Sequence, residues 1–186
     1  TAQSALSYCE SQQLFINEVA ELTKTLPVHV THNDTKINNL LFCEQSNQVK
    51  VVIDLDTCMA GFLMHDFGDM VRTCCSNLPE DGTDLDKMSV RIDIFQALSD
   101  AYLEGFGEKI SPREKESLVV GALLLPFMIG VRFLTDYLNG DIYFQTKHPE
   151  HNLERALNQF KLFRLLKEKR EVLAHIVQSK ELISSE

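Results

Sequence analysis

A polar segment that leads straight into an apolar run is the feature that most limits how this chain can fold. Residues 31–42 read T-H-N-D-T-K-I-N-N-L-L-F. A surface loop does not need this order. A strand would not begin with so many Asn, Asp and Thr side chains, because these compete for backbone hydrogen bonds. The segment is typical of a catalytic loop that leads directly into a strand.

A second apolar run follows close behind the first. Residues 40–42 and 49–53 are both β-prone, and the residues between them are turn-like. An antiparallel hairpin with a two-residue turn would place Asn39 opposite Asp54, with Cβ atoms roughly 4.5–5.5 Å apart. A longer loop would move the register by about one residue. Asp56 points to the same side as Asp54 if the strand stays extended, so the hairpin is expected to gather three oxygen-bearing side chains at its open end.

The oxygens gathered there suit a magnesium ion. Mg²⁺ takes one or two protein carboxylates and completes its shell with water and phosphate oxygens. The Asn39 amide and the Asp54 and Asp56 carboxylates would supply such ligands. Asp34 can then face the metal as a base, and Lys36 can place a positive charge on a transferred phosphoryl group. The ordinary alternative is that these are turn residues and that Asp54 merely ends a strand.

These residues resemble a known family. Residues 32–39 match the kinase catalytic-loop pattern H-x-D-x-x-x-x-N. Residues 51–56, V-V-I-D-L-D, resemble the I-D-x-D signature of the aminoglycoside phosphotransferase and choline kinase superfamily. The resemblance implies a kinase-like fold, ATP as co-substrate, Mg²⁺ on Asn39 and Asp54, and Asp34 as the base.

Two further residues could be mistaken for catalytic groups but are interpreted as structural. Asp66 opens a literal D-F-G triplet, but it lies too far beyond Asp54 for the hairpin to hold it beside Asn39. The resemblance implies that Asp66 accepts backbone N–H bonds from the catalytic loop, and the local pattern leaves a plain helix cap open. His32 is expected to bond through its ring to backbone near Asp54, with catalysis by His32 as the alternative.

Within the superfamily, the sequence is closest to the N-acetylhexosamine 1-kinases. T-H-N-D-T-K-x-N-N, V-I-D-L-D-T, H-D-F-G-D and residues 130–144, G-V-R-F-L-T-D-Y-L-N-G-D-I-Y-F, all resemble that group. By this resemblance both Arg132 and Tyr143 would hold the sugar. Arg132 would act as a hydrogen-bond fork, and Tyr143 would stack on the sugar or contact it through its hydroxyl group. Asp136, one helical turn after Arg132, is expected to orient its guanidinium. The ordinary alternatives are an Arg at a helix end and a Tyr in the core.

Most of the remaining sequence predicts helices. One helix is expected to end before Pro27 and another to begin at Asp66, with Asp69 in a capping position. After a helix that includes Ile94 and Tyr102, another is expected to begin at Ser111, where Pro and Glu follow in the pattern of a helix start, and to run to about Asn139. The last is expected to begin near Pro149 and continue past Leu173. The predicted fold class is therefore mainly α with a small β-hairpin (α+β).

The chain shows no glycine-rich phosphate loop. None of its eight glycines forms G-x-G-x-x-G, and the sequence opens on Thr1 without Met, directly in a helical pattern. A relative would carry the phosphate loop in a preceding β-rich lobe. Residues 1–186 are therefore expected to be the C-terminal catalytic and substrate-binding lobe of an aminoglycoside phosphotransferase-like fold. The N-terminal nucleotide-binding lobe is expected to be absent, and the chain alone to be inactive.

Composition limits the partners and the compartment. The net charge of -9 argues against a nucleic-acid surface. Five cysteines without C-x-x-C spacing, and the lack of a signal peptide, favour a reducing cytoplasm. The most apolar run, residues 118–131, is too short to cross a membrane and predicts a buried helix. A lobe without its partner would expose an apolar face, so a homo-oligomer is an expected state.

The predicted activity is ATP-dependent phosphorylation of the anomeric hydroxyl of an N-acetylhexosamine. One alternative keeps the reaction but changes the acceptor to choline, an aminoglycoside or homoserine. The acidic loop, residues 77–86 with Asp81, Asp84 and Asp86, would suit such a cationic acceptor, whereas Arg132 favours a neutral, hydroxyl-rich one. Another alternative is a non-catalytic module that binds a sugar or a protein partner.

Overall fold

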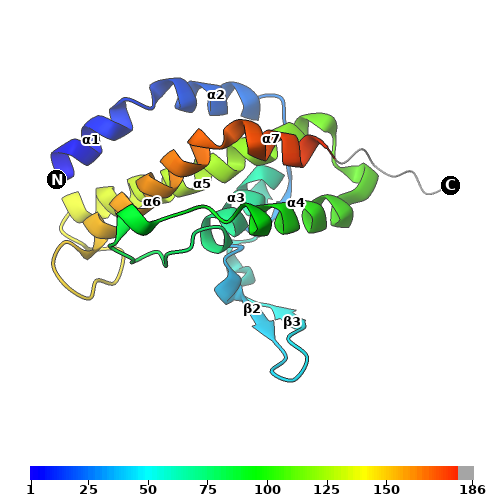
Figure 1. The fold of residues 1–186 in the computed structure, drawn as a ribbon, viewed down its shortest axis with the longest axis horizontal. Coiled ribbons are helices and arrows are strands. Elements are labelled where there is room, and N and C mark those ends of the chain that lie inside the picture. Colours follow the sequence, from blue (N-terminus) through cyan, green and yellow to red (C-terminus); the bar gives the residue numbers. More distant parts are fainter. Residues whose placement is uncertain (180–186) are drawn as a thin grey trace.

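Helices form most of the chain and lie side by side in one body (Figure 1). The computed structural model describes residues 1–179. The helices are α1 (Ala2–Glu10), α2 (Gln13–Thr23), α3 (Leu63–Cys74), α4 (Ile92–Phe106), α5 (Pro112–Leu138), α6 (His151–Glu168) and α7 (Arg170–Gln178). With two small sheets beside them, the expected α+β class is confirmed.

Helices α3 and α5 meet at the centre of this body in unusually close contact. A Cβ atom at Gly121 would lie 2.0 Å from the Met64 carbonyl oxygen, and one at Gly68 would lie 2.2 Å from the Gly121 oxygen. Only glycine allows two helix backbones to approach this closely. Phe67, between Met64 and Gly68 in sequence, is fully buried. The D-F-G triplet therefore packs the two helices together.

The start of α5 follows its sequence signature. The Ser111 hydroxyl accepts the Glu114 backbone N–H at 3.3 Å, while Glu114 accepts the Ser111 backbone N–H at 2.9 Å. Pro112 occupies the first helical position, where its missing N–H costs nothing. The predicted helix start at Ser111 is confirmed.

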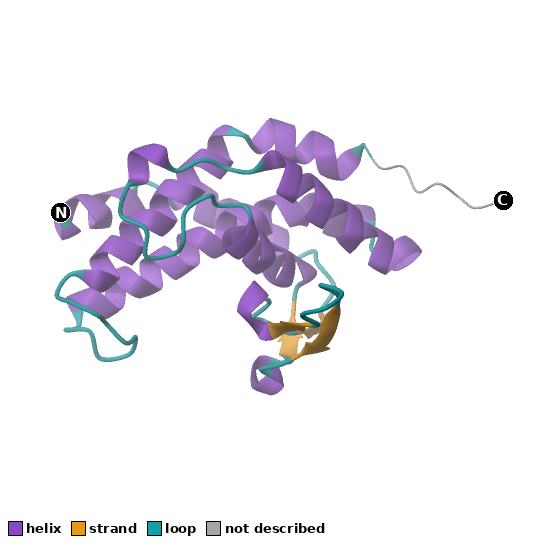
Figure 2. Cartoon of the chain, turned by 60° about the horizontal axis from the view of Figure 1, so that its bottom comes forward, coloured by secondary structure: helices purple, strands orange, loops and turns teal. Residues whose placement is uncertain are grey.

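The strands form two antiparallel pairs at one edge of the helical body (Figure 2). β1 (His29–Thr31) pairs with β4 (Met59–Gly61), and β2 (Leu40–Phe42) pairs with β3 (Val49–Val52). The β2–β3 hairpin projects away from the helices, on the side opposite α1 and α2 (Figure 1). The sequence predicts this hairpin from its two β-prone runs.

The register of the hairpin differs by one residue from the two-residue-turn prediction. Leu40 lies opposite Val52 rather than Ile53, because the turn is longer and the pairing is irregular after Leu41. The Ile53 backbone N–H still donates to the Asn39 carbonyl oxygen at 2.9 Å. Asn39 and Asp54 therefore remain next to each other at the open end.

Two predicted helices are interrupted. The first is split into α1 and α2 at residues 11–12, where the Ser11 hydroxyl donates to the Tyr8 carbonyl oxygen at 2.7 Å and competes with the helical bond. The last is split into α6 and α7 at Lys169, whose N–H turns back to the Leu166 carbonyl oxygen at 3.0 Å. The expectation of single helices is wrong at both places.

Helix α5 is longer than its apolar run indicated. It spans 27 residues, and by length and composition it is the one helix in residues 1–179 that could cross a membrane. However, 67% of its most apolar window is buried inside the fold, as in the core helix of a globular protein. The expected burial of the apolar run is therefore confirmed.

The five cysteines are all free. Cys75 is completely buried, and burial raises the pKa of its thiol to about 12. A thiol held in its protonated form is a poor nucleophile. Cys75 is therefore an inert thiol in the core.

Candidate active site

Asp34 lies at the centre of a small group of polar side chains on the loop between β1 and β2. Its Oδ2 atom accepts hydrogen bonds from Lys36 Nζ at 2.6 Å and from Asn39 Nδ2 at 2.8 Å. Asn39 also donates to the Asp34 carbonyl oxygen at 2.8 Å. The Lys36 ammonium lies 3.9 Å from Asp54 Oδ2. Four of the predicted site residues are thus brought together.

These neighbours set the protonation state of Asp34. Burial acts to raise the pKa of this carboxyl, but the hydrogen bonds from Lys36 and Asn39, with the Lys36 charge, hold it below its usual value. Asp34 is therefore an ionised acceptor at neutral pH. Such a carboxylate orients a hydroxyl group well but binds a proton weakly.

Asp54 and Asp56 come together through a turn, not along an extended strand. β3 ends at Val52, Asp54 has a left-handed backbone (φ 65°), and Leu55–Thr57 form a short 3₁₀-helix. The expectation of an extended strand is wrong. The turn nevertheless allows a hydrogen bond between the two carboxyl groups, which together with the Asp56 charge raises the pKa of Asp54.

The donor atoms in this turn fit a magnesium ion. Two neighbouring carboxylates repel each other when both are ionised, and a divalent cation removes that penalty. Because the Asn39 nitrogen is committed to Asp34, its amide oxygen is left as an acceptor. Within residues 1–179 no group of three or more His, Cys, Asp or Glu side chains is placed to hold a metal. Two carboxylates and one amide match the few protein ligands that Mg²⁺ takes.

Asp66 and His32 hold the loop in shape. The Asp66 carboxylate accepts the backbone N–H groups of His32 at 2.9 Å and Asn33 at 2.7 Å. α3 begins three residues before Asp66, at Leu63, so Asp66 is not its cap. His32 Nε2 lies 3.1 Å from the Ile53 carbonyl oxygen, next to Asp54.

Asp69 lies one helical turn beyond Asp66, and it does not cap a helix as expected, because α3 has already begun. It is buried and accepts hydrogen bonds from Arg72, whose Nε lies 2.8 Å from Asp69 Oδ1. Arg72 also donates to Glu80 at 2.6 Å. Arg72 and Glu80 line a hollow of about 300 Å³ together with Lys36; we call this the Lys36 hollow.

Arg132 and Tyr143 come together at a second hollow of about 290 Å³, lined also by Asp136 and Phe144; we call this the Arg132 hollow. The Arg132 guanidinium carbon lies 5.7 Å from the Tyr143 ring centre. Tyr143 is 72% exposed and so is not a core residue. The two hollows share no lining residue.

Asp136 does not orient Arg132 as expected. Its carboxylate instead accepts the backbone N–H groups of Ile142, Tyr143 and Phe144, at 2.8–3.1 Å. Asn152 also donates to Asp136 at 2.9 Å. Burial acts to raise the pKa of Asp136, but these backbone hydrogen bonds hold it below its usual value. Asp136 therefore fixes the segment that carries Tyr143.

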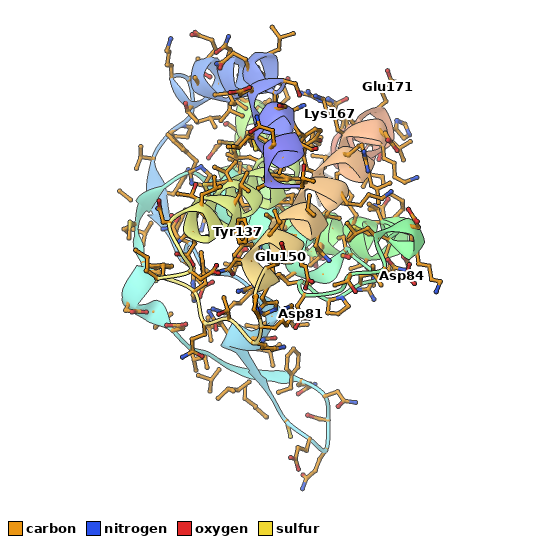
Figure 3. All side chains as sticks on the ribbon, turned by 90° about the vertical axis from the view of Figure 1, so that its left-hand side faces the viewer. Asp81, Asp84, Tyr137, Glu150, Lys167 and Glu171 are labelled. Carbon is orange, nitrogen blue, oxygen red and sulfur yellow. The ribbon has the colours of Figure 1, made fainter. Side chains whose placement is uncertain are left out.

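The acidic loop offers little uncompensated charge. Asp81 is paired with Lys147 at 2.6 Å, and Asp84 with Lys87 at 2.6 Å. Figure 3 labels both aspartates on this loop. A pocket for a cationic acceptor needs carboxylates that the protein leaves unpaired. Only Asp86, which is exposed, has no ion-pair partner among the described residues of this loop.

Sequence reasoning missed Arg72, Glu80 and Arg155. Asp69 and Arg72 are three residues apart in one helix, a spacing that predicts a side-chain pair. The other pairing, between Glu80 and Arg155 at 2.6 Å, joins residues far apart in the sequence. No local pattern signals such a contact.

A comparison with known families matches residues 2–108 to the phosphotransferase enzyme family (APH). The match covers more than half of the chain and includes Asp34, Lys36, Asn39 and Asp54, whereas Arg132 and Tyr143 lie beyond it. The chain therefore belongs to the phosphotransferase enzyme family, a group of kinase-type transferases.

Proposed function

We propose that this chain is the C-terminal lobe of a kinase that transfers phosphate from ATP to the anomeric hydroxyl of an N-acetylhexosamine. The observation that carries the proposal is the arrangement around Asp34. Lys36 Nζ lies 2.6 Å from Asp34 and 3.9 Å from Asp54. The Lys36 ammonium group therefore lies between the proposed proton acceptor and a carboxylate that could bind a metal ion. Phosphoryl transfer needs such groups in fixed positions more than it needs covalent chemistry.

Each residue has a distinct role in the proposed reaction. Asp34 accepts a hydrogen bond from the hydroxyl group of the sugar and so directs a lone pair of the hydroxyl oxygen at the phosphorus atom. Because the pKa of Asp34 is low, the hydroxyl proton moves late, after the new O–P bond has begun to form. Lys36 offsets negative charge on the moving phosphoryl group.

The metal site would be formed by Asn39, Asp54 and Asp56. When bound, Mg²⁺ would neutralise charge on the phosphate oxygens of ATP. Asn39 has a second role, because its nitrogen holds the Asp34 carboxylate in place. His32 and Asp66 support the loop without touching the reacting atoms.

An uncharged sugar is the favoured acceptor. Arg132 offers a fork of hydrogen-bond donors and Tyr143 an exposed ring, which suit the hydroxyls and the apolar face of a pyranose. The carboxylates near the Lys36 hollow are paired: Asp69 with Arg72, and Glu80 with Arg72 and Arg155. This pairing disfavours choline, an aminoglycoside or another cationic acceptor.

A second candidate is a non-catalytic sugar-binding or partner-binding module. It is favoured by the lack of a G-x-G-x-x-G sequence among the eight glycines. A cytoplasmic location is proposed for either function, because all five cysteines are free.

Calorimetry separates these candidates. We expect N-acetylglucosamine or N-acetylgalactosamine to bind the chain, and choline and kanamycin not to bind. Binding of sugar but not of Mg-ATP fits a lone C-terminal lobe that acts as a binding module, whereas tight binding of both would contradict the expected absence of the nucleotide site. Failure of every sugar to bind, with binding of a cationic acceptor, contradicts the proposed substrate class.

In an enzyme that carries both lobes, Asp34→Ala should lower the turnover measured by ADP release roughly 10²–10⁴-fold, the usual contribution of a positioned acid–base group. Asp86→Asn, a change at an exposed carboxylate, is the control and should leave the rate unchanged. A near-normal rate for Asp34→Ala would show that Asp34 is not the base.

A further inference from the structure

A continuous chain of hydrogen bonds connects the two hollows. It begins at Arg72, which lines the Lys36 hollow, and passes through Glu80 to Arg155 on α6. From there it continues to Asn152 and Asp136, and it ends on the backbone of the segment that carries Tyr143. We call this chain the Glu80 relay.

Glu80 is the central link because both of its oxygens are used. Oε2 accepts from Arg72 at 2.6 Å, and Oε1 accepts from Arg155 at 2.6 Å. The Arg72 side chain is only 7% exposed and that of Arg155 17%. Two partly buried guanidinium groups thus converge on one carboxylate, and water cannot replace it easily.

The far end of the relay reaches the proposed sugar site twice. Through hydrogen bonds, Arg155 Nη1 donates to Asn152 Oδ1 at 3.2 Å, and Asn152 in turn donates to Asp136. Through packing, the Arg155 guanidinium lies 3.8 Å from the ring centre of Phe133, which contacts Phe144. Both routes end in the wall of the Arg132 hollow.

We infer that Glu80 is a positioning residue for the acceptor: it fixes the Arg132–Tyr143 surface relative to the Lys36 hollow beside Asp34. The inference rests on the proposed function, because it assumes that the acceptor contacts both places. A shift of about 1 Å in the bound substrate is enough to lower a transfer rate severely. A rigid link between the two surfaces would therefore compensate for the cost of partly burying the Glu80 carboxylate.

Removal of the Glu80 charge should break this link. In Glu80→Gln the amide keeps one oxygen to accept from one arginine but presents an NH₂ group to the other. The two guanidinium groups then repel each other. Arg155 should move from Phe133, and the segment with Tyr143 should become mobile.

The test combines sugar affinity with amide hydrogen exchange measured by NMR. In Glu80→Gln we expect the Kd for N-acetylglucosamine to rise about tenfold, which corresponds to about 1.4 kcal/mol. We also expect exchange of the Ile142, Tyr143 and Phe144 amides to accelerate about tenfold, with α5 amides unchanged. The matched control is Glu116→Gln, which removes an exposed pair with Arg113 (side chains about half exposed).

Sugar affinity and amide exchange test the proposed function and the Glu80 relay separately. If the wild-type chain binds no acceptor, the proposed function is wrong, and amide exchange alone then decides the relay. If Glu80→Gln lowers only the melting temperature, and matches Glu116→Gln in affinity and in exchange at residues 142–144, Glu80 is merely structural. If Glu80→Gln fails to fold, Arg155→Lys takes its place in the test. Lysine keeps the charge but cannot bridge Glu80 and Asn152, so we expect the same rise in Kd and in amide exchange at residues 142–144.

Discussion

At the scale of single residues, Asp66 determines the shape of the loop that carries Asp34. Each of its two oxygens accepts one backbone N–H group, from His32 and from Asn33. Asn33 has a left-handed backbone (φ 62°), which costs energy for a residue other than glycine. The Asp66 bonds compensate for that cost and hold the loop ready.

Asp66→Asn should therefore destabilise the fold. The new NH₂ group would face one of the two backbone N–H donors and leave it without an acceptor. We expect the free energy of unfolding to fall by about 1–3 kcal/mol, measured by urea denaturation, with faster exchange of the His32 and Asn33 amides. Asp86→Asn, at an exposed site, should change neither; equal effects of both variants would contradict this role of Asp66.

The Glu80 carboxylate should make the stability of the fold depend on pH. Burial acts to raise its pKa, but the hydrogen bond from Arg155 and the charges of Arg72 and Arg155 hold it below the usual 4.5. A depressed pKa contributes stability above pH 4.5, and that contribution is lost as the pH falls through the folded-state value.

At pH 7 the wild type should therefore exceed Glu80→Gln by about 2–3 kcal/mol, less than the roughly 3–5 kcal/mol of a fully buried pair because a third of the side chain is exposed. The two stabilities, measured by denaturant unfolding, should begin to approach each other as the pH falls below 4.5 and should converge once it has passed the lower pKa of Glu80 in the folded protein. A difference independent of pH would mean that the Glu80 charge is not responsible.

The residues around Asp34 were predictable because their contacts are local. Asp34, Lys36 and Asn39 lie within six residues, and the hairpin pairing adds Asp54. Glu80 and Arg155 were not, since their contact depends on where the loop after α3 lies against α6. Asp136 was placed on the correct helix face, but its partners lie in a turn whose path the sequence did not reveal.

At the scale of elements, the contact of α3 with α5 is the least tolerant of change. Gly121→Ala would place a Cβ 2.0 Å from the Met64 carbonyl oxygen, a backbone atom that cannot rotate away. We expect a loss of about 3 kcal/mol in the free energy of unfolding, at the upper end of ordinary overpacking.

Gly105→Ala is the matched control for this prediction. Gly105 lies in α4, and a Cβ there would meet nothing within 4 Å. Alanine restricts the unfolded chain and favours the helix, so we expect a gain of about 0.4–1 kcal/mol. Circular dichroism in urea measures both variants. Equal stability of Gly121→Ala and wild type would mean that the helices can separate without cost.

Element type was easier to predict than element ends. The capping box at Ser111 and the two β-prone runs are strong local signals, and both elements formed. β4 has the sequence M-A-G, which carries no strand signal, and it is a strand only because β1 lies beside it. The breaks at residues 11–12 and at Lys169 arise from single hydrogen bonds that periodicity does not detect.

At the scale of the whole molecule, the β2–β3 hairpin projects from the helices and exposes apolar side chains. Phe42, Val49 and Val51 are each about half exposed, and the hairpin stands clear of the helices (Figure 1). Contiguous apolar surface on an edge of this kind favours association with another protein surface.

We therefore expect the chain to associate in solution in a concentration-dependent manner, measurable by sedimentation velocity. Val51→Lys should raise the dissociation constant about tenfold or more, since a charge must then be desolvated. Val172→Lys, at a similarly exposed residue on α7, should have no effect. A strictly monomeric wild type would contradict the expectation of a homo-oligomer.

The anchor at Asp136 has a consequence for protein engineering. It binds backbone N–H groups, and every amino acid except proline supplies one. Positions 142 and 143 can therefore be randomised in a library while the main chain keeps its path. If Tyr143 contacts the acceptor as proposed, new acceptor preferences can be selected there without redesign of the scaffold.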